Sequence, residues 1–312
     1  MAQMGNNDSI SHKIENSVDE ILSQFQNLEA EAEQVRSNDR IIIRGLLGNF
    51  YGRRLNVGIG MQRTYGAILS GDYFELFKLP DGNYLFVFAD ISGHGLPAYT
   101  TLIRLRSALT LTVKEAEKRM EAGGGSLNPE DIVRDAGTKF TDVMDAAGSS
   151  DFASIIFTYI RNDGDKYYLR FFNRGMFFPL VVRKFRNSLV NLYDLNEQEK
   201  GWFPAKGYLL GSEFRRLLGD RYNNYPSCEF ILYEGDIIMY FSDGLIEAQK
   251  KDDKFECFGL DRMKEILLSH YTIFPQAIVN TIYDEVYDFM GDMRMQNDDM
   301  TAVIIDFPLV RP

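Results

Sequence analysis

The chain has little cysteine, no long apolar run and no excess of basic residues, and each shortage excludes a class of protein. Its two cysteines, Cys228 and Cys257, are far apart and lie outside any CxxC spacing, so neither a zinc module nor a disulfide framework is indicated. No apolar run approaches membrane-spanning length, and the polar start from residue 1 to residue 9 lacks the hydrophobic core of a signal peptide. We therefore expect a cytoplasmic protein without membrane insertion. The net charge of -11 disfavours nucleic-acid binding.

A heptad pattern marks the first part of the chain. Apolar residues recur there with alternating spacings of four and three, at Ile14, Val18, Ile21, Phe25, Leu28, Ala32 and Val35. This pattern predicts a helix whose narrow apolar seam suits a partner helix, either in a homodimer or on the body of the same chain. Gly45, Gly48 and Gly52 interrupt the pattern, which places a boundary between residues 37 and 54. We interpret residues 1–50 as a helical regulatory or dimerisation segment and residues 51–312 as a separate domain.

Within residues 51–312, runs of strands are segregated from pairs of helices. This arrangement favours an α+β fold of two mainly antiparallel sheets packed together, with helices outside. Strands are predicted at residues 55–60, 65–79, 84–90, 152–160, 167–173, 178–184, 189–195, 229–233, 236–241 and 301–307, and helices at 96–122, 128–146, 260–270 and 275–290. A content of 45% hydrophobic and 13% aromatic residues is enough for a large core.

Four aspartates stand in glycine-flanked or strand-flanked contexts: Asp72, Asp90, Asp243 and Asp298. An anionic side chain at the end of an apolar strand is costly to pack unless something positive meets it. One Asp-Gly pair alone is more often a turn than a ligand. The set of four indicates a carboxylate cage for hard divalent cations.

The chemistry of such a cage follows from its donor atoms. Oxygen ligands without histidine or thiolate favour Mn²⁺ or Mg²⁺ over zinc. Two such ions can share a bridging water, lower its pKa and neutralise the charge that builds on a phosphoryl group during in-line attack. The aspartates therefore predict a hydrolase of phosphate esters with a metal-activated water and two bound ions.

The order of the motifs resembles that of a known family. They are Gly71-Asp72, Asp90 to Ala98 (Asp-x-Ser-Gly-His-Gly-x-x-Ala), Asn173 to Leu180, Leu232 to Asp236, Tyr240 to Ala248 (Tyr-x-Ser-Asp-Gly-x-x-Glu-Ala) and Asp298 to Thr301. This series resembles the SpoIIE-like bacterial branch of the type 2C serine/threonine phosphatases. The resemblance implies an α-β-β-α sandwich and a metal-dependent phosphatase that acts on phosphoserine or phosphothreonine in a regulator protein. The usual substrates in that family are anti-sigma factor antagonists, so the resemblance also implies a part in sigma factor regulation.

The resemblance also implies roles for particular residues. The metal ligands fall on Asp72, Asp90, the backbone carbonyl of Ile91, Asp243 and Asp298, with Asp299 as an extra or supporting group. His94 either donates a proton to the leaving alkoxide or orients its loop by hydrogen bonding. Where the family has Ala-Gly-His after the strand asparagine, this chain has Arg174-Gly175-Met176. Arg174 is thus either a ligand for the incoming phosphate or a solvated surface residue.

Three hypotheses follow. The leading one is a cytoplasmic Mn²⁺- or Mg²⁺-dependent protein phosphatase that takes part in signal transduction. The second is a catalytically inactive module that keeps the phosphatase fold and binds a partner protein. The third, a metal phosphodiesterase that acts on a nucleotide, is disfavoured because no Gly-rich phosphate loop or basic groove stands out.

Overall fold

The computed structural model describes residues 49–50, 53–67, 69–123, 126–164, 166–183, 188–191 and 207–307. All of these belong to one compact unit, Arg44–Pro312. The predicted helical segment 1–50 lies outside the described residues apart from Asn49 and Phe50, so its helix and its role stay predictions.

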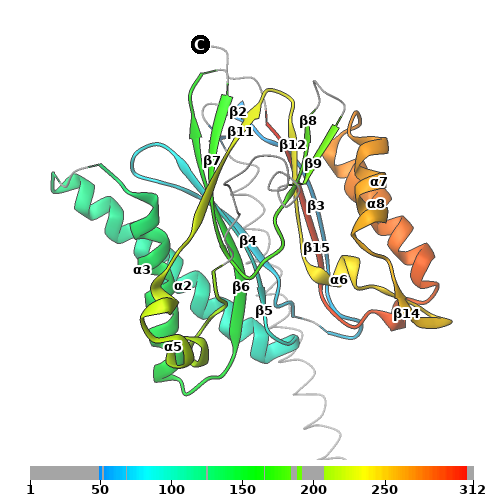
Figure 1. Ribbon diagram of the computed structural model, residues 1–312, viewed down its shortest axis with the longest axis horizontal. Helices are drawn as coiled ribbons and strands as arrows, with labels where there is room; N and C mark the ends of the chain where they lie inside the picture. The colour runs from blue at the N-terminus through cyan, green and yellow to red at the C-terminus, as the bar shows by residue number, and fades with distance from the viewer. Residues whose placement is uncertain are drawn as a thin grey trace, which may run out of the picture. The chain divides into compact units, whose positions relative to one another are not determined.

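Two antiparallel sheets form the centre of this unit (Figure 1). The six-stranded sheet has the order β11-β7-β6-β5-β4, with a short sixth strand, β10, paired to β6. Its strands are β4 (Tyr73–Lys78), β5 (Tyr84–Ile91), β6 (Phe152–Asn162), β7 (Lys166–Arg174), β10 (Leu210–Gly211) and β11 (Ser227–Tyr233). Neighbours along the main path are also neighbours in sequence for β4 to β7. Short turns connect β4 to β5 and β6 to β7, whereas the connection from β5 to β6 runs through the helices of residues 95–146.

The five-stranded sheet has the order β3-β15-β12-β8-β9. Its strands are β3 (Asn56–Gln62), β8 (Leu180–Arg183), β9 (Ser188–Asn191), β12 (Ile237–Phe241) and β15 (Met300–Asp306). The last of these strands in the sequence, β15, is inserted between β3 and β12 and pairs with both. Two short pairs, β1 (Asn49–Phe50) with β2 (Arg53–Arg54) and β13 (Gln249–Lys250) with β14 (Asp253–Cys257), lie outside the two sheets.

Helices cover both outer faces (Figure 1). The six-stranded sheet carries α2 (Gly95–Glu121), α3 (Pro129–Ala146), α5 (Ser212–Leu218) and the 3₁₀ turn η2 (Gly219–Asn223), and the other sheet carries α7 (Leu260–His270) and α8 (Pro275–Met290). The short elements α6 (Asp243–Ile246) and η3 (Met293–Met295) lie in connections. The start of α3 follows from sequence, because the Asn128 side chain accepts a hydrogen bond from the Glu130 N–H and Pro129 occupies the first turn.

Alternation along the strands decides which side chains enter the space between the sheets. Phe86 and Phe88 of β5 pack on Tyr240 of β12 with ring centroids 4.6 and 6.0 Å apart, and the Tyr240 hydroxyl donates to Thr158 Oγ1 of β6 at 2.9 Å. Residues with the same parity as Phe88 in β5 therefore face the other sheet. Asp90 is one of them.

The predicted α-β-β-α sandwich of two antiparallel sheets is confirmed. One predicted strand, 65–79, is too long, since the strand covers only Tyr73–Lys78. The residues before it leave the sheet because Thr64 and Gly71 are held by hydrogen bonds to the Asp299 carboxylate. The elements between residues 207 and 223 and the β13–β14 hairpin were not predicted. Within the described residues, every helix is too short or too polar to span a bilayer.

Candidate active site

The four predicted aspartates lie at one end of the two sheets. Asp72 immediately precedes β4 and Asp90 is the penultimate residue of β5, and these ends are adjacent because Tyr73 pairs with Ala89. In the other sheet, Asp243 follows the end of β12 and Asp298 precedes the start of β15, where Phe241 pairs with Ala302. Antiparallel pairing therefore brings residues far apart in sequence to two neighbouring strand ends.

Ser242 joins the two sheets at this end. Its hydroxyl donates to Asp72 Oδ2 at 2.8 Å and accepts from the Thr301 N–H at 2.9 Å, while its own N–H donates to the Thr301 carbonyl at 3.0 Å. Ser242 and Asp72 are both almost fully buried. The carboxylate of one sheet is thus fixed to the strand ends of the other.

The electrostatics of Asp90 reflect this convergence. Burial, followed by the negative charges of Asp243, Asp298, Asp299 and Glu247 in that order, raises the pKa of the Asp90 carboxyl from 3.8 to about 8. Carboxylates that act on one another in this way lie within electrostatic reach of one another. The mutual repulsion would be relieved by a cation at this point.

The other three aspartates show the same direction of shift. Burial raises the pKa of Asp72 well above its usual range, and the charge of Asp90 adds to this. Burial also raises the pKa values of Asp243 and Asp298, with the charge of Asp243 adding to the effect on Asp298 and His94 acting in the opposite direction. All four carboxyls are therefore strained as anions in the protein alone.

These residues fit a hard divalent cation. Asp72 Oδ1 and Asp243 Oδ1 are buried without a hydrogen-bond partner, and within the described residues no Lys or Arg forms an ion pair with any of the four aspartates. No three His, Cys, Asp or Glu side chains of the described part are already close enough to hold a metal ion, so the structure shows no preassembled coordination shell. Separation of like charges is the expected geometry of the protein alone, and metal ligation by these residues stays a proposal.

Backbone packing keeps the strand ends close. A side chain at Gly71 would lie 2.9 Å from the Ile91 carbonyl oxygen, and one at Gly244 would lie 2.2 Å from the Asp299 carbonyl oxygen. Both positions need glycine because another chain segment passes directly against them. The Ile91 carbonyl, a predicted ligand, therefore lies beside the segment that carries Asp72.

The loop after β5 carries His94. Ser92 extends the β5–β6 pairing, since its N–H donates to the Phe152 carbonyl at 2.9 Å and its hydroxyl accepts from the Phe152 N–H at 3.0 Å. Gly93 and Gly95 have φ values of 80° and 71°, as the predicted turn requires. His94 precedes α2, is exposed and makes no capping hydrogen bond. Its ring is free to meet a ligand from solvent.

The position of Arg174 fits neither of the two roles that the sequence suggested, a ligand for phosphate or a solvated surface residue. It is fully buried, and its guanidinium donates to the carbonyls of Tyr208, Tyr222 and Asn224 between the rings of Tyr222 and Tyr225. Asn173 pairs with Ile156, which shares the Asp90 side of the sheet, so Arg174 points to the opposite, helix-covered face. The phosphate-binding role predicted for Arg174 is not supported.

Replacing Arg174 by Met is expected to destabilise the domain by about 2–4 kcal/mol, because one buried and two part-buried carbonyl groups lose their donor. Chemical denaturation of the variant measures this loss. The KM for a small phosphate ester should stay at the wild-type value. A raised KM with unchanged stability would instead show that Arg174 binds phosphate.

Sequence reasoning missed Ser242 and Thr64 as parts of the site. Ser242 stands in the Tyr-x-Ser-Asp-Gly motif, and this position was the available signal. Thr64 carries no motif signal, since its contact with Asp299 joins residues 235 positions apart.

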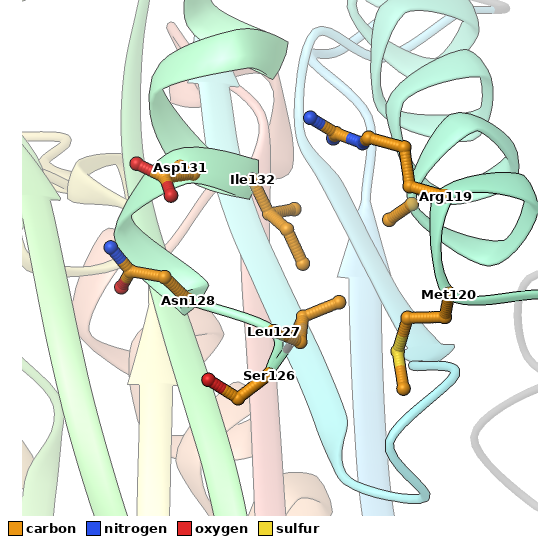
Figure 2. Close-up of a pocket in the computed structure, with 8 residues that line it drawn as sticks. Arg119, Met120, Ser126, Leu127, Asn128, Asp131 and Ile132 are labelled. Atoms are coloured by element: carbon orange, nitrogen blue, oxygen red, sulfur yellow. The ribbon is translucent and has the colours of Figure 1, made fainter. Parts of the chain in front are cut away.

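A pocket elsewhere in the domain does not carry this chemistry. It lies between the end of α2 and the start of α3 (Figure 2), and its lining residues are Ala116, Arg119, Met120, Ser126, Leu127, Asn128, Asp131 and Ile132. Arg119 is 24 residues along α2 from Gly95, which at the rise of a helix is about 36 Å. The pocket is therefore remote from the four aspartates, and we assign no function to it.

Comparisons with known proteins agree with this architecture. Residues 80–308 match the family model of Stage II sporulation protein E (SpoIIE). The Phosphoserine phosphatase RsbU of Bacillus subtilis (strain 168) is 22% identical over 285 residues, which cover 90% of this chain and 73% of RsbU.

Solved structures show the same fold. The SiaA-PP2C domain of Pseudomonas aeruginosa superposes with a TM-score of 0.65 at 16% identity and covers 90% of this chain and 98% of its own. The RsbU and RsbW domains of Rv1364c from Mycobacterium tuberculosis give 0.57 at 18% identity, covering 83% and 61%. The PP2C phosphatase domain of SpoIIE from Bacillus subtilis, with a fragment of its regulatory domain, gives 0.57 at 16% identity, covering 82% and 64%.

The two-sheet sandwich is the fold of the PP2C phosphatase domains in these structures. The family match covers well over half of the chain and includes three of the four aspartates. The chain belongs to the SpoIIE family.

Proposed function

We propose that the chain is a metal-dependent phosphatase that removes phosphate from phosphoserine or phosphothreonine in a regulatory protein of the anti-sigma factor antagonist type. The observation that carries the proposal is the convergence of four aspartates, from the buried Asp72 to the exposed Asp298, at the joined ends of two sheets. Their pKa values are raised, and they have no cationic partner among the described residues. The similarity to the phosphoserine phosphatase RsbU supports the substrate class.

The proposed chemistry assigns each residue a task. Asp72, Asp90, Asp243, Asp298 and the Ile91 carbonyl would hold Mn²⁺ or Mg²⁺, with two ions expected. Bound ions would lower the pKa of a water and offset the charge that develops on the phosphoryl group. His94 is exposed and lies close enough to Asp298 to affect the pKa of that carboxyl. This position suits a proton donor to the leaving serine or threonine oxygen. No side chain is assigned a covalent phosphoryl group.

Metal removal is the first test. The chelated protein is expected to release no phosphate from p-nitrophenyl phosphate, and addition of Mn²⁺ or Mg²⁺ is expected to restore release, because the aspartates alone cannot neutralise the transferring group. The same assay on a phosphorylated anti-sigma factor antagonist examines the substrate class. A folded sample that binds this protein but releases no phosphate with either metal would favour the inactive binding module.

The proposal also includes a role for the predicted helical segment 1–50. We infer that it regulates the phosphatase domain or joins two copies of the chain through its heptad seam. Mass measurement in solution, with and without residues 1–50, distinguishes a dimer held by this segment from a monomer. A monomeric full-length chain would limit the segment to regulation.

A further inference from the structure

We propose that Asp299 is a positioning residue, which fastens the segment before Asp72 to the start of β15 and so sets the affinity of the site for its divalent cation. This inference depends on the proposed metal role of the neighbouring aspartates and adds a residue that holds them in place. Asp299 itself is 3% exposed and is assigned no contact with metal or substrate.

Both oxygens of the Asp299 carboxylate are occupied by the same distant segment. Oδ1 accepts from the Thr64 N–H at 2.6 Å and from the Thr64 hydroxyl at 2.9 Å, and Oδ2 accepts from the Gly71 N–H at 2.7 Å. Hydrogen bonds to a buried carboxylate are short and about twice as strong as neutral ones. Asp299 therefore closes both ends of the loop between β3 and β4.

Gly71 connects Asp299 to two predicted ligands, Asp72 and the Ile91 carbonyl. Its N–H is held by Asp299, its carbonyl accepts from the Ile91 N–H at 3.3 Å, and the next residue is Asp72. The Asp72 carboxylate is in turn held by Ser242, whose hydroxyl also approaches the Asp299 carbonyl at 3.3 Å. The position of Asp299 is thus connected by single residues to the segments that carry Asp72 and Asp90.

The adjacent residues Asp298 and Asp299 differ in exposure and in hydrogen bonding. One carboxylate oxygen of Asp298 accepts from the Asp299 N–H at 2.8 Å, and the residue is exposed. Asp299 is turned away from solvent and uses both oxygens as acceptors for N–H groups. An asparagine of the same size would satisfy only one of these two N–H groups and would direct its own NH₂ against the other.

The test is direct Mn²⁺ binding by titration calorimetry on the full chain without substrate, together with the melting temperature of the metal-free protein. The Asp299→Asn variant is expected to bind Mn²⁺ about 10–100-fold more weakly, as is usual when a group that orients a metal ligand is lost. Its turnover at saturating Mn²⁺ is expected to remain measurable, because the proposed ligands are intact.

Asp236 supplies a matched control at the other end of the same sheet. It is a buried aspartate that accepts from the Tyr233 N–H at 2.9 Å and from Arg183 at 2.7 Å. Asp236→Asn should lower the melting temperature without weakening Mn²⁺ binding. If both variants lose stability but only Asp299→Asn loses Mn²⁺ affinity, the effect is positional rather than a general loss of stability.

Variants of Thr64 provide a second test if Asp299→Asn does not fold. Thr64→Val removes one of the three hydrogen bonds and keeps the negative charge, so a smaller loss of Mn²⁺ affinity is expected, and Thr64→Ser should restore it. Wild-type affinity in Asp299→Asn, or in Thr64→Val when only that variant folds, overturns the positioning role alone. Failure of the wild-type chain to bind Mn²⁺ overturns the metal proposal and this one together.

Discussion

Replacing Asp243 by Asn is expected to reduce phosphate release from a phosphorylated protein by several orders of magnitude. Asp243 stands at the start of α6, where its Oδ1 is buried without a hydrogen-bond partner and burial raises its pKa. Backbone hydrogen bonds from Gly244 and Asp243 itself offset part of this effect, and a cation would stabilise the carboxylate further. The amide removes the negative charge that the ion needs, so the variant should lose bound metal and activity together.

The fold of the Asp243→Asn variant should survive. Since the carboxylate repels Asp90 and Asp298, the neutral amide relieves this repulsion, and the metal-free variant should melt at or above the wild-type temperature. Asp163→Asn, in the exposed hairpin turn between β6 and β7, is the matched control and should keep full activity. Wild-type turnover by Asp243→Asn, or isolation of a covalent phosphoenzyme, would contradict the proposed chemistry.

The metal-free protein is expected to lose stability as the pH rises from about 4 to about 8. In the folded chain the pKa of Asp90 is about 8, whereas in the unfolded chain it returns to its usual value near 3.8. Between these values the unfolded state has released the proton and the folded state still holds it, so each pH unit favours unfolding. The raised pKa values of Asp72, Asp243 and Asp298 act in the same direction.

The expected loss is roughly a few kcal/mol in the free energy of unfolding; it begins above the unfolded pKa and is complete above the folded one. Denaturant unfolding of the chelated protein at several values between pH 5 and pH 8.5 measures it. The Asp90→Asn variant should show a shallower dependence and should be more stable than wild type at pH 8. Saturating Mn²⁺ should remove most of the decline. A metal-free protein that gains stability toward pH 8 would show that the carboxylates are not held close together.

The elements of the sandwich could be predicted because their signals are local. The strand pattern before Asp90, the turn at Asp81-Gly82 and the proline at the start of α3 each act over a few residues. The Asp81 side chain accepts from the Asn83 N–H at 3.0 Å, and Gly82 has a φ of 85°, as such a turn requires. The same local reasoning predicted the loop around Gly93 and Gly95.

The parts that failed depend on partners far away in sequence. Arg174 is the last residue of β7 and carries a charge, so its position alone suggested solvent or phosphate. Its burial follows from contacts with Tyr208, Tyr222 and Tyr225, which come close to Arg174 only in the folded chain. In the same way, the buried position of Asp299 depends on its hydrogen bonds with Thr64, which no local pattern connects to it.

The place of β15 in its sheet has a consequence for biosynthesis. This strand is translated after every other described strand, yet it fills the gap between β3 and β12 and is preceded directly by Asp298 and Asp299. Until it emerges from the ribosome, β3 has no neighbour in its sheet. The proposed site, which includes Asp298, can therefore form only after this strand has been added.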